Sequence, residues 1–189
     1  MLNGDTPLRV RRSTLARLKR DVRGAAALEF AIVAPVFLML LFSIFEAGWF
    51  FFANSTVDQA TARAARLIRT GQVQSTTTPI NQAAFFNEIC RVTQLLGPCA
   101  QRLTVDVQRF NDFAALAADL SQPTCRDATP AQIAAIPYSA GGQRDIVRVR
   151  VCFLHKSINP ALGLKLGKTP DGMRKMYSVA IFRNEPFQN

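Results

Sequence analysis

The residues with the clearest chemical meaning lie at the head of a long apolar segment. Gly24 follows a basic stretch, and Glu29 and Phe30 come after four intervening residues. Glycine has no Cβ, so a peptide containing it can enter a narrow cleft in extended form. A carboxylate is costly in a membrane, by about 2.5 to 3.5 kcal/mol at the bilayer centre, and is therefore an unusual residue here. The pattern predicts cleavage between Gly24 and Ala25 and a specific role for Glu29.

The apolar segment predicts a membrane-spanning helix. It runs from Phe30 to Ala53, which is 24 residues or about 36 Å of helix, and a bilayer core of about 30 Å needs roughly 20 residues. It is longer than the apolar region of a removable secretory signal. Pro35 lies inside it and is either a tolerated kink or a point where the helix melts locally and curves within an assembly.

The basic residues predict the orientation of this helix. Residues 1–24 contain seven Lys or Arg and two Asp, whereas the whole chain has 23 basic and 13 acidic residues and a formal charge of +10. Half of the net charge thus lies in the segment before the apolar run. An excess of Lys and Arg is typical of the cytoplasmic flank of a membrane helix. We expect a cytoplasmic N-terminus and an exported C-terminal domain. This split weakens an interpretation of the basicity as a nucleic-acid footprint.

The rest of the chain predicts a continued helix followed by a small α+β domain. Val57, Ala60 and Ala64 recur at helical spacing, and Gly71 is a typical helix stop. Further patterns predict a helix over 79–96, a short helix over 112–120, irregular stretches over 121–143 and 159–171, and strands over 103–110, 146–154 and 176–182. We expect an antiparallel sheet of about three strands on the long helix.

The expected organisation has four parts: a basic leader over 1–24, a transmembrane helix over 25–53, a helix extension over 54–71 and a periplasmic α+β domain over 72–189. Three arginines of the extension, Arg63, Arg66 and Arg69, fall largely off its apolar stripe. We interpret them mainly as a solvated face that complements the helix end, and binding of a partner is the alternative.

All four cysteines follow the membrane segment, which favours disulfides in an oxidising compartment. Three pairings are possible, and we favour Cys90–Cys99 with Cys125–Cys152. Buried free thiols are the alternative.

No pattern in the sequence predicts catalysis, a metal site or a cofactor. His155 is the only histidine, follows a predicted strand, and is expected on the surface or in a loop. No CxxC, GxSxG, HExxH or phosphate-binding loop is present. Alternating Arg148 and Arg150 could contact nucleic acid, but no aromatic stacking array accompanies them, so we expect none. We expect a protein that is not an enzyme.

The pattern from Gly24 to Phe30 resembles the type IV prepilin processing signal in its Flp/Tad form. Two later segments, over 64–72 and 182–187, are similar to those of the TadE-like family, the minor pseudopilins of the tight-adherence pilus. The resemblance implies cleavage at Gly24–Ala25 by a membrane prepilin peptidase. It also implies an inner-membrane location, possible association with the pilus, and roles in pilus assembly and adhesion. The implied partners are the Tad inner-membrane platform, a sister minor pilin and the major Flp pilin. The TadF type shares the motif, so the choice between the two types stays open.

Two interpretations of the whole chain remain. In the first, the chain is a processed pilin, and Glu29 pairs with the new amine of Ala25 on an adjacent subunit, because an unpaired carboxylate in a low-dielectric bundle is costly. Otherwise Glu29 merely lies among lipid headgroups. In the second, the chain is a bitopic binding module that is neither processed nor polymerised.

Overall fold

The computed structural model describes residues 24–75, 80–158, 169 and 171–187. The predicted leader lies outside the described residues except for Gly24. The chain forms two compact units, Met1–Phe42 and Ser43–Asn189. The second is a mixed α+β domain with a three-stranded antiparallel sheet, which confirms the predicted fold class.

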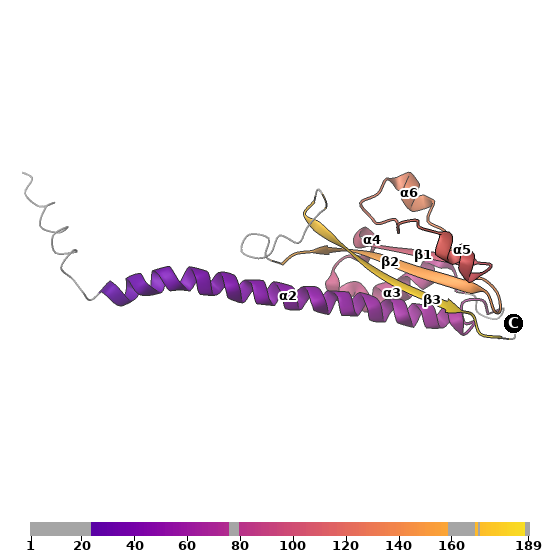
Figure 1. Ribbon diagram of the computed structural model, residues 1–189, viewed down its shortest axis with the longest axis horizontal. Coiled ribbons are helices and arrows are strands. Elements are labelled where there is room, and N and C mark those ends of the chain that lie inside the picture. The colour runs from indigo at the N-terminus through magenta and orange to yellow at the C-terminus, as the bar shows by residue number, and fades with distance from the viewer. Residues whose placement is uncertain (1–23, 76–79, 159–168, 170, 188–189) are drawn as a thin grey trace, which may run out of the picture. The chain divides into compact units, whose positions relative to one another are not determined.

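The longest element is helix α2 (Ala25–Arg69), which belongs to both units (Figure 1). It ends as the sequence predicts. Gly71 has a φ of +78°, and the N–H groups of Gly71 and Gln72 donate to the carbonyls of Ile68 and Leu67, at 3.0 Å each. This paired arrangement satisfies the last carbonyls of a helix and favours glycine at the left-handed position.

The sheet has the order β1 (Leu103–Phe110), β2 (Ile146–Lys156), β3 (Met173–Arg183), and both pairs are antiparallel. In its register, Val107 lies opposite Val149, which lies opposite Ala180. β2 and β3 extend beyond the predicted strands because their pairing continues to Lys156 and Met173.

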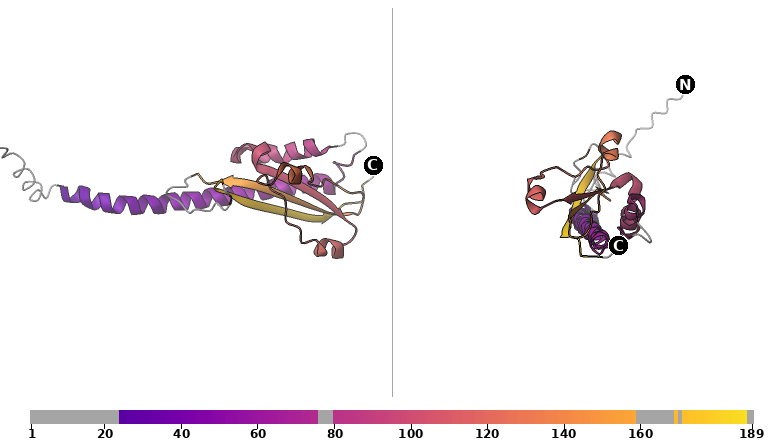
Figure 2. Two further views of the ribbon diagram at one scale, coloured as in Figure 1. Left: turned by 90° about the horizontal axis from the view of Figure 1, so that it is seen from above. Right: turned by 90° about the vertical axis from the view of Figure 1, so that its right-hand side faces the viewer.

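One face of the sheet packs on two helices. Helix α3 (Gln82–Thr93) lies beside α2 (Figure 2), and both contribute to a single buried cluster with the strands. Asn81 caps the N-terminus of α3 by accepting from the Ala84 N–H at 2.8 Å. The helix predicted over 79–96 is therefore shorter, and a 3-10 turn η2 (Gln94–Leu96) follows it before Gly97.

The segment between β1 and β2, residues 111–145, covers much of the other face and is called the cover segment below. It contains the short helices α5 (Phe113–Ala118) and α6 (Pro130–Ala134), and α4 (Cys99–Arg102) precedes β1. Helix α6 corrects the prediction of an irregular stretch over 121–143. Its N-terminus is fixed by a capping box between Thr129 and Gln132, which allows even a short helix to form.

Polar contacts hold this cover to the sheet. Arg148 donates to the carboxylate of Asp119 at 2.5 Å, and Arg150 pairs with Asp106 and donates to the Ser121 carbonyl at 2.5 Å. Hydrogen bonds from Ser121, followed by Arg148, hold the pKa of Asp119 well below its usual range. Both arginines are thus buried and paired, which leaves little of their charge for nucleic acid.

Candidate functional site

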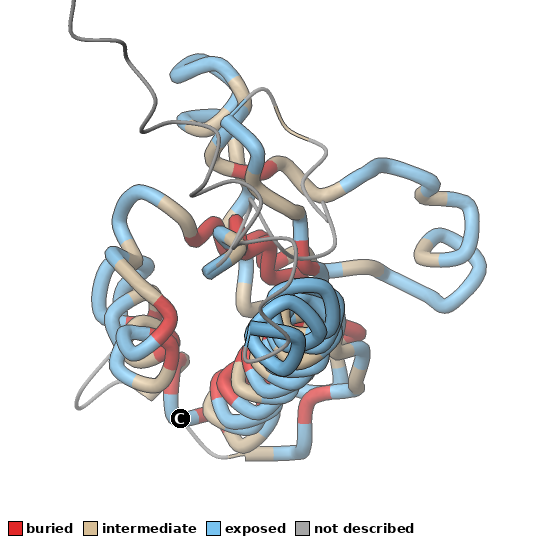
Figure 3. Tube along the Cα trace, turned by 90° about the vertical axis from the view of Figure 1, so that its left-hand side faces the viewer, coloured by how far each residue is buried: buried red, intermediate tan, exposed pale blue. Residues whose placement is uncertain are grey.

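The described part of the first unit, residues 24–42, is helical and exposes apolar side chains. Phe30, Ile32, Val33 and Val36 are each more than 60% exposed. The most apolar 18-residue window of α2 has a mean hydropathy of 2.4 and no buried residue. In Figure 3 the exposed residues of this part are pale blue. Because exposed apolar side chains on this scale are unfavourable in water, this part of α2 has the surface of a membrane span, and the helix is long enough to cross a bilayer.

The residues of the predicted processing motif lie at the first turns of α2. Gly24 precedes the helix and Ala25 begins it, and both are exposed. A Cβ built on Gly24 would meet no atom within 4 Å. A larger side chain would therefore fit at position 24 in the folded chain. Packing within this chain does not explain the glycine.

Glu29 and Phe30 follow on the exposed helix. Glu29 lies four residues after Ala25, which places the two positions one turn apart on one face of α2. Phe30 is 73% exposed. No described residue forms an ion pair with Glu29.

Pro35 lies within α2, and the helix is continuous on both sides of it. The described helix is therefore not melted at this position. The choice between a tolerated kink and a hinge used in an assembly stays a prediction.

The second half of α2 forms the spine of the domain. Ala53, Val57, Ala60, Ala64 and Ile68 are at most 1% exposed and belong to the main buried cluster. This is the predicted stripe of Val57, Ala60 and Ala64, and it continues to Ile68. The small alanines let the sheet and α3 approach the helix closely.

The domain also packs against part of the C-terminal end of the predicted membrane span. Trp49 and Phe50 pack against the main cluster, whereas Phe51 and Phe52 are exposed. Glu46 is 2% exposed, and its carboxylate accepts from the Ile158 N–H at 3.1 and 3.3 Å.

His155 corrects another prediction, because it is 2% exposed and not on the surface. It is the tenth residue of β2, on the same face as Val151 and Phe153, and its ring meets Phe50 edge-on at 5.8 Å. Burial lowers its pKa, an effect opposed by Glu46 and reinforced by Arg102 and Arg174. The predicted strand ended at residue 154. Had it been extended by one residue, the alternation would have placed His155 on the buried face with Val151 and Phe153.

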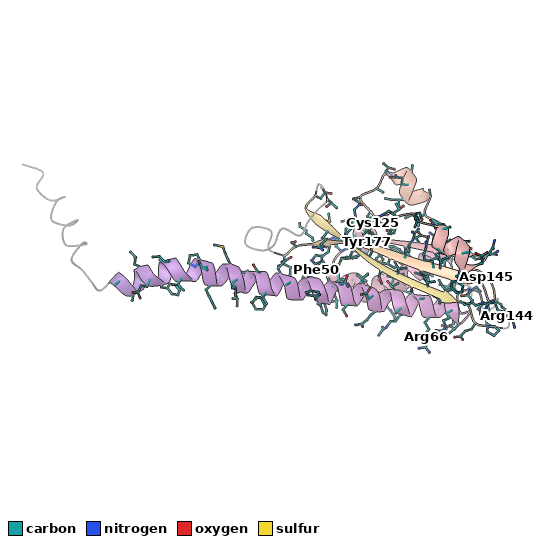
Figure 4. The ribbon with its side chains drawn as sticks, in the orientation of Figure 1. Phe50, Arg66, Cys125, Arg144, Asp145 and Tyr177 are labelled. Atoms are coloured by element: carbon teal, nitrogen blue, oxygen red, sulfur yellow. A yellow bond between two sulfur atoms is a disulfide. The ribbon has the colours of Figure 1, made fainter. Side chains whose placement is uncertain are left out.

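The four cysteines form the favoured pairs, Cys90–Cys99 and Cys125–Cys152. The first links α3 to α4. The second ties the cover segment to β2, and Cys125 is labelled in Figure 4. Among the described residues, no group of three or more His, Cys, Asp or Glu is arranged to hold a metal ion.

These features define a class of protein: one long apolar helix, suited to a single-pass membrane anchor, that continues into a small disulfide-linked α+β domain. Residues 24–66 match the family model described as TadE-like protein, which is consistent with a TadE-like protein of the Tad pilus system. The match begins at Gly24 and ends within α2. No curated protein and no solved structure matches the chain.

Proposed function

We propose that this chain is a minor pilin or pseudopilin of a Flp/Tad-type pilus with a structural and not an enzymatic role. A prepilin peptidase cuts it between Gly24 and Ala25. The mature protein then acts in pilus assembly and so in adhesion and surface attachment. The observation that carries the proposal is the TadE-like match from Gly24, at the point where an exposed apolar helix begins.

The location follows from the charge pattern. The basic leader stays in the cytoplasm, the N-terminal part of α2 crosses the inner membrane, and the disulfide-linked domain, which includes the second half of α2, lies in the periplasm, where its bonds persist. The partners are the peptidase, the Tad inner-membrane platform, a sister minor pilin and the major Flp pilin.

Glu29 has a specific task in this proposal. Cleavage turns Ala25 into an α-amine, and Glu29 lies one helical turn away on an exposed surface. Within a bundle of apolar helices, the carboxylate of one subunit pairs with the amine of its neighbour, because an unpaired charge there is costly. The pair thereby fixes the axial register between subunits.

The first experiment measures the intact mass and N-terminal sequence of the protein from its native membranes. We expect a chain that begins at Ala25 in the wild type and at Met1 in Gly24→Trp. Gly48→Trp is the matched control, because Gly48 lies on the same helix and its Cβ would also meet no atom within 4 Å. An uncut wild-type chain in peptidase-positive cells would leave the bitopic binding module as the function.

The second experiment separates assembly from processing. Glu29→Gln should be cut normally but should fail to enter sheared pili, whereas Asp58→Asn, which alters an exposed acid on the same helix, should enter them. Normal incorporation of Glu29→Gln would refute the register role and leave the cleavage proposal intact.

A further inference from the structure

The two edges of the sheet differ. Along the edge of β1, the Val107 N–H donates to the Pro137 carbonyl at 3.1 Å, and its carbonyl accepts from the Ser139 N–H at 2.8 Å. β3 forms the opposite edge, and no described residue pairs with its outer side as a strand. Alternate residues of a strand direct their N–H and C=O groups to each side, so β3 presents open hydrogen-bonding groups there.

The outer face of β3 carries an apolar row. Tyr177, Val179 and Ile181 are 44%, 53% and 51% exposed. The cover segment reaches their neighbours on β2, because Cys125 is bonded to Cys152, which pairs in register with Tyr177. The cover segment does not bury the row itself, and Tyr177 is labelled in Figure 4. Exposed apolar residues at the centre of an open edge are what soluble proteins usually avoid.

The inner side of the same edge opens into a basic groove. The groove has a volume of about 550 Å³ and lies between α2 and the end of β3. Ala62 and Ala65 give it apolar surface, Arg66 and Arg69 supply positive charge, and Glu185 also lines it. Arg69 pairs with Glu185 at 3.0 Å, whereas Arg66 is exposed and forms no ion pair with a described residue.

We propose that this edge binds an extended segment of a partner protein, added to the sheet as a fourth strand. Successive side chains of a strand point to opposite faces, so the two flanks of β3 define the chemistry of the segment. Residues on one face are apolar and pair across the strand with Tyr177, Val179 and Ile181. Residues on the other face are carboxylates that reach Arg66 in the groove.

A second copy of this chain does not fit the edge. β3 contains Arg174, Lys175 and Arg183 and no acidic residue, and among the described ion pairs only that of Lys175 with Asp127 compensates one of these charges. Antiparallel pairing of β3 with itself would bring these like charges from the two strands together, which is unfavourable. Charge complementarity therefore selects a different, acidic partner. The inference does not depend on processing or on entry into a pilus.

The test uses the full chain in nanodiscs of zwitterionic lipid and the probe peptide acetyl-Thr-Val-Glu-Val-Glu-Val-Thr-amide. Binding is followed by anisotropy of a neutral dye on the peptide. We expect saturable binding that weakens about tenfold in Arg66→Glu, since one charge-assisted contact is lost. Arg63→Glu is the matched control, because Arg63 is exposed on the same helix and does not line the groove, and it should change binding less than twofold.

Two further measurements locate the peptide. A lysine version, with both glutamates replaced, should not bind the wild type, and this comparison needs no change to the protein. Bound glutamate peptide should slow amide exchange in β3 and leave β1 unchanged. Equal binding of the lysine peptide, an equal loss in Arg63→Glu, protection outside β3, or no saturable binding would overturn the proposal. Self-association of the chain through β3 would overturn it as well.

Discussion

The two disulfides should differ in their contribution to stability, because they close loops of different length. Cys90 and Cys99 are nine positions apart, and Cys125 and Cys152 are 27 apart. In the chain-entropy treatment, these loops correspond to about 2.6 and about 3.5 kcal/mol at 25 °C. Cys125–Cys152 also anchors the cover segment over the buried Arg148 and Arg150. Its removal should therefore lower the free energy of unfolding by more than the entropy of the loop alone.

The perturbations are the paired replacements Cys90→Ala with Cys99→Ala and Cys125→Ala with Cys152→Ala. The assay is amide exchange of β2 in the full chain, because the most buried amides report the opening of the whole domain. Converted at 1.4 kcal/mol per tenfold, exchange should accelerate about 70-fold in the first variant and at least about 300-fold in the second. Reductant added to the wild type should accelerate exchange at least as much as the second variant does.

Two results would refute this reasoning. An equal or larger effect from the Cys90–Cys99 pair would show that loop length and the cover do not determine the difference. Unchanged exchange in both variants would show that neither disulfide constrains the unfolded chain in the way the entropy argument requires.

Three more predictions concern single side chains of the domain. Asp106→Ala should lower the free energy of unfolding by about 3 kcal/mol, because it leaves Arg150 buried without its carboxylate. Glu88→Ala, at a more exposed ion pair with Arg91, should cost at most about 1 kcal/mol in the same denaturant titration. Burial lowers the pKa of His155 from its ordinary value, so the unfolded chain takes up the proton first and stability should fall as pH drops below about 6.5; His155→Phe should flatten that dependence, and an unchanged slope would contradict it. Gly71→Ala should cost at least about 1 kcal/mol in thermal melts, because its φ is +78° and a Cβ would lie 2.3 Å from a phenylalanine ring; an unchanged melting temperature would show that the turn adapts.

Local patterns predicted the fold well where burial alternates regularly. The stripe of Val57, Ala60 and Ala64 and the stop at Gly71 follow from helical spacing and one residue type. The strands over 103–110 and 146–154 were likewise predicted, because their valines alternate with polar residues and form a continuous apolar layer on one side of the sheet.

The same approach failed where contacts depend on distant parts of the chain. Glu46 belongs by sequence to an apolar run, and only its approach to Ile158 explains its burial. Arg148 and Arg150 have the pattern of a solvated face, yet the cover segment buries them against Asp119 and Ser121. No periodicity in the chain encodes these pairings.

The open edge of β3 could not be predicted from the sequence for a related reason. Tyr177, Val179 and Ile181 have the pattern of one face of a strand, and a pattern does not say whether a neighbour covers that face. The groove beside Arg66 also depends on the packing of α2 against β3.

The position of α2 in the core has a consequence for the order in which the domain is made. Synthesis completes α2 first, with Ala53, Val57 and Ile68 ready to pack, but β3 begins only at Met173. Until β3 is synthesised, the apolar stripe of α2 lacks part of the sheet that packs on it. Contacts between segments that are distant in sequence also form slowly. The nascent domain therefore passes through a stage in which an apolar helix awaits its sheet, and a chaperone that shields this stripe would act at that stage.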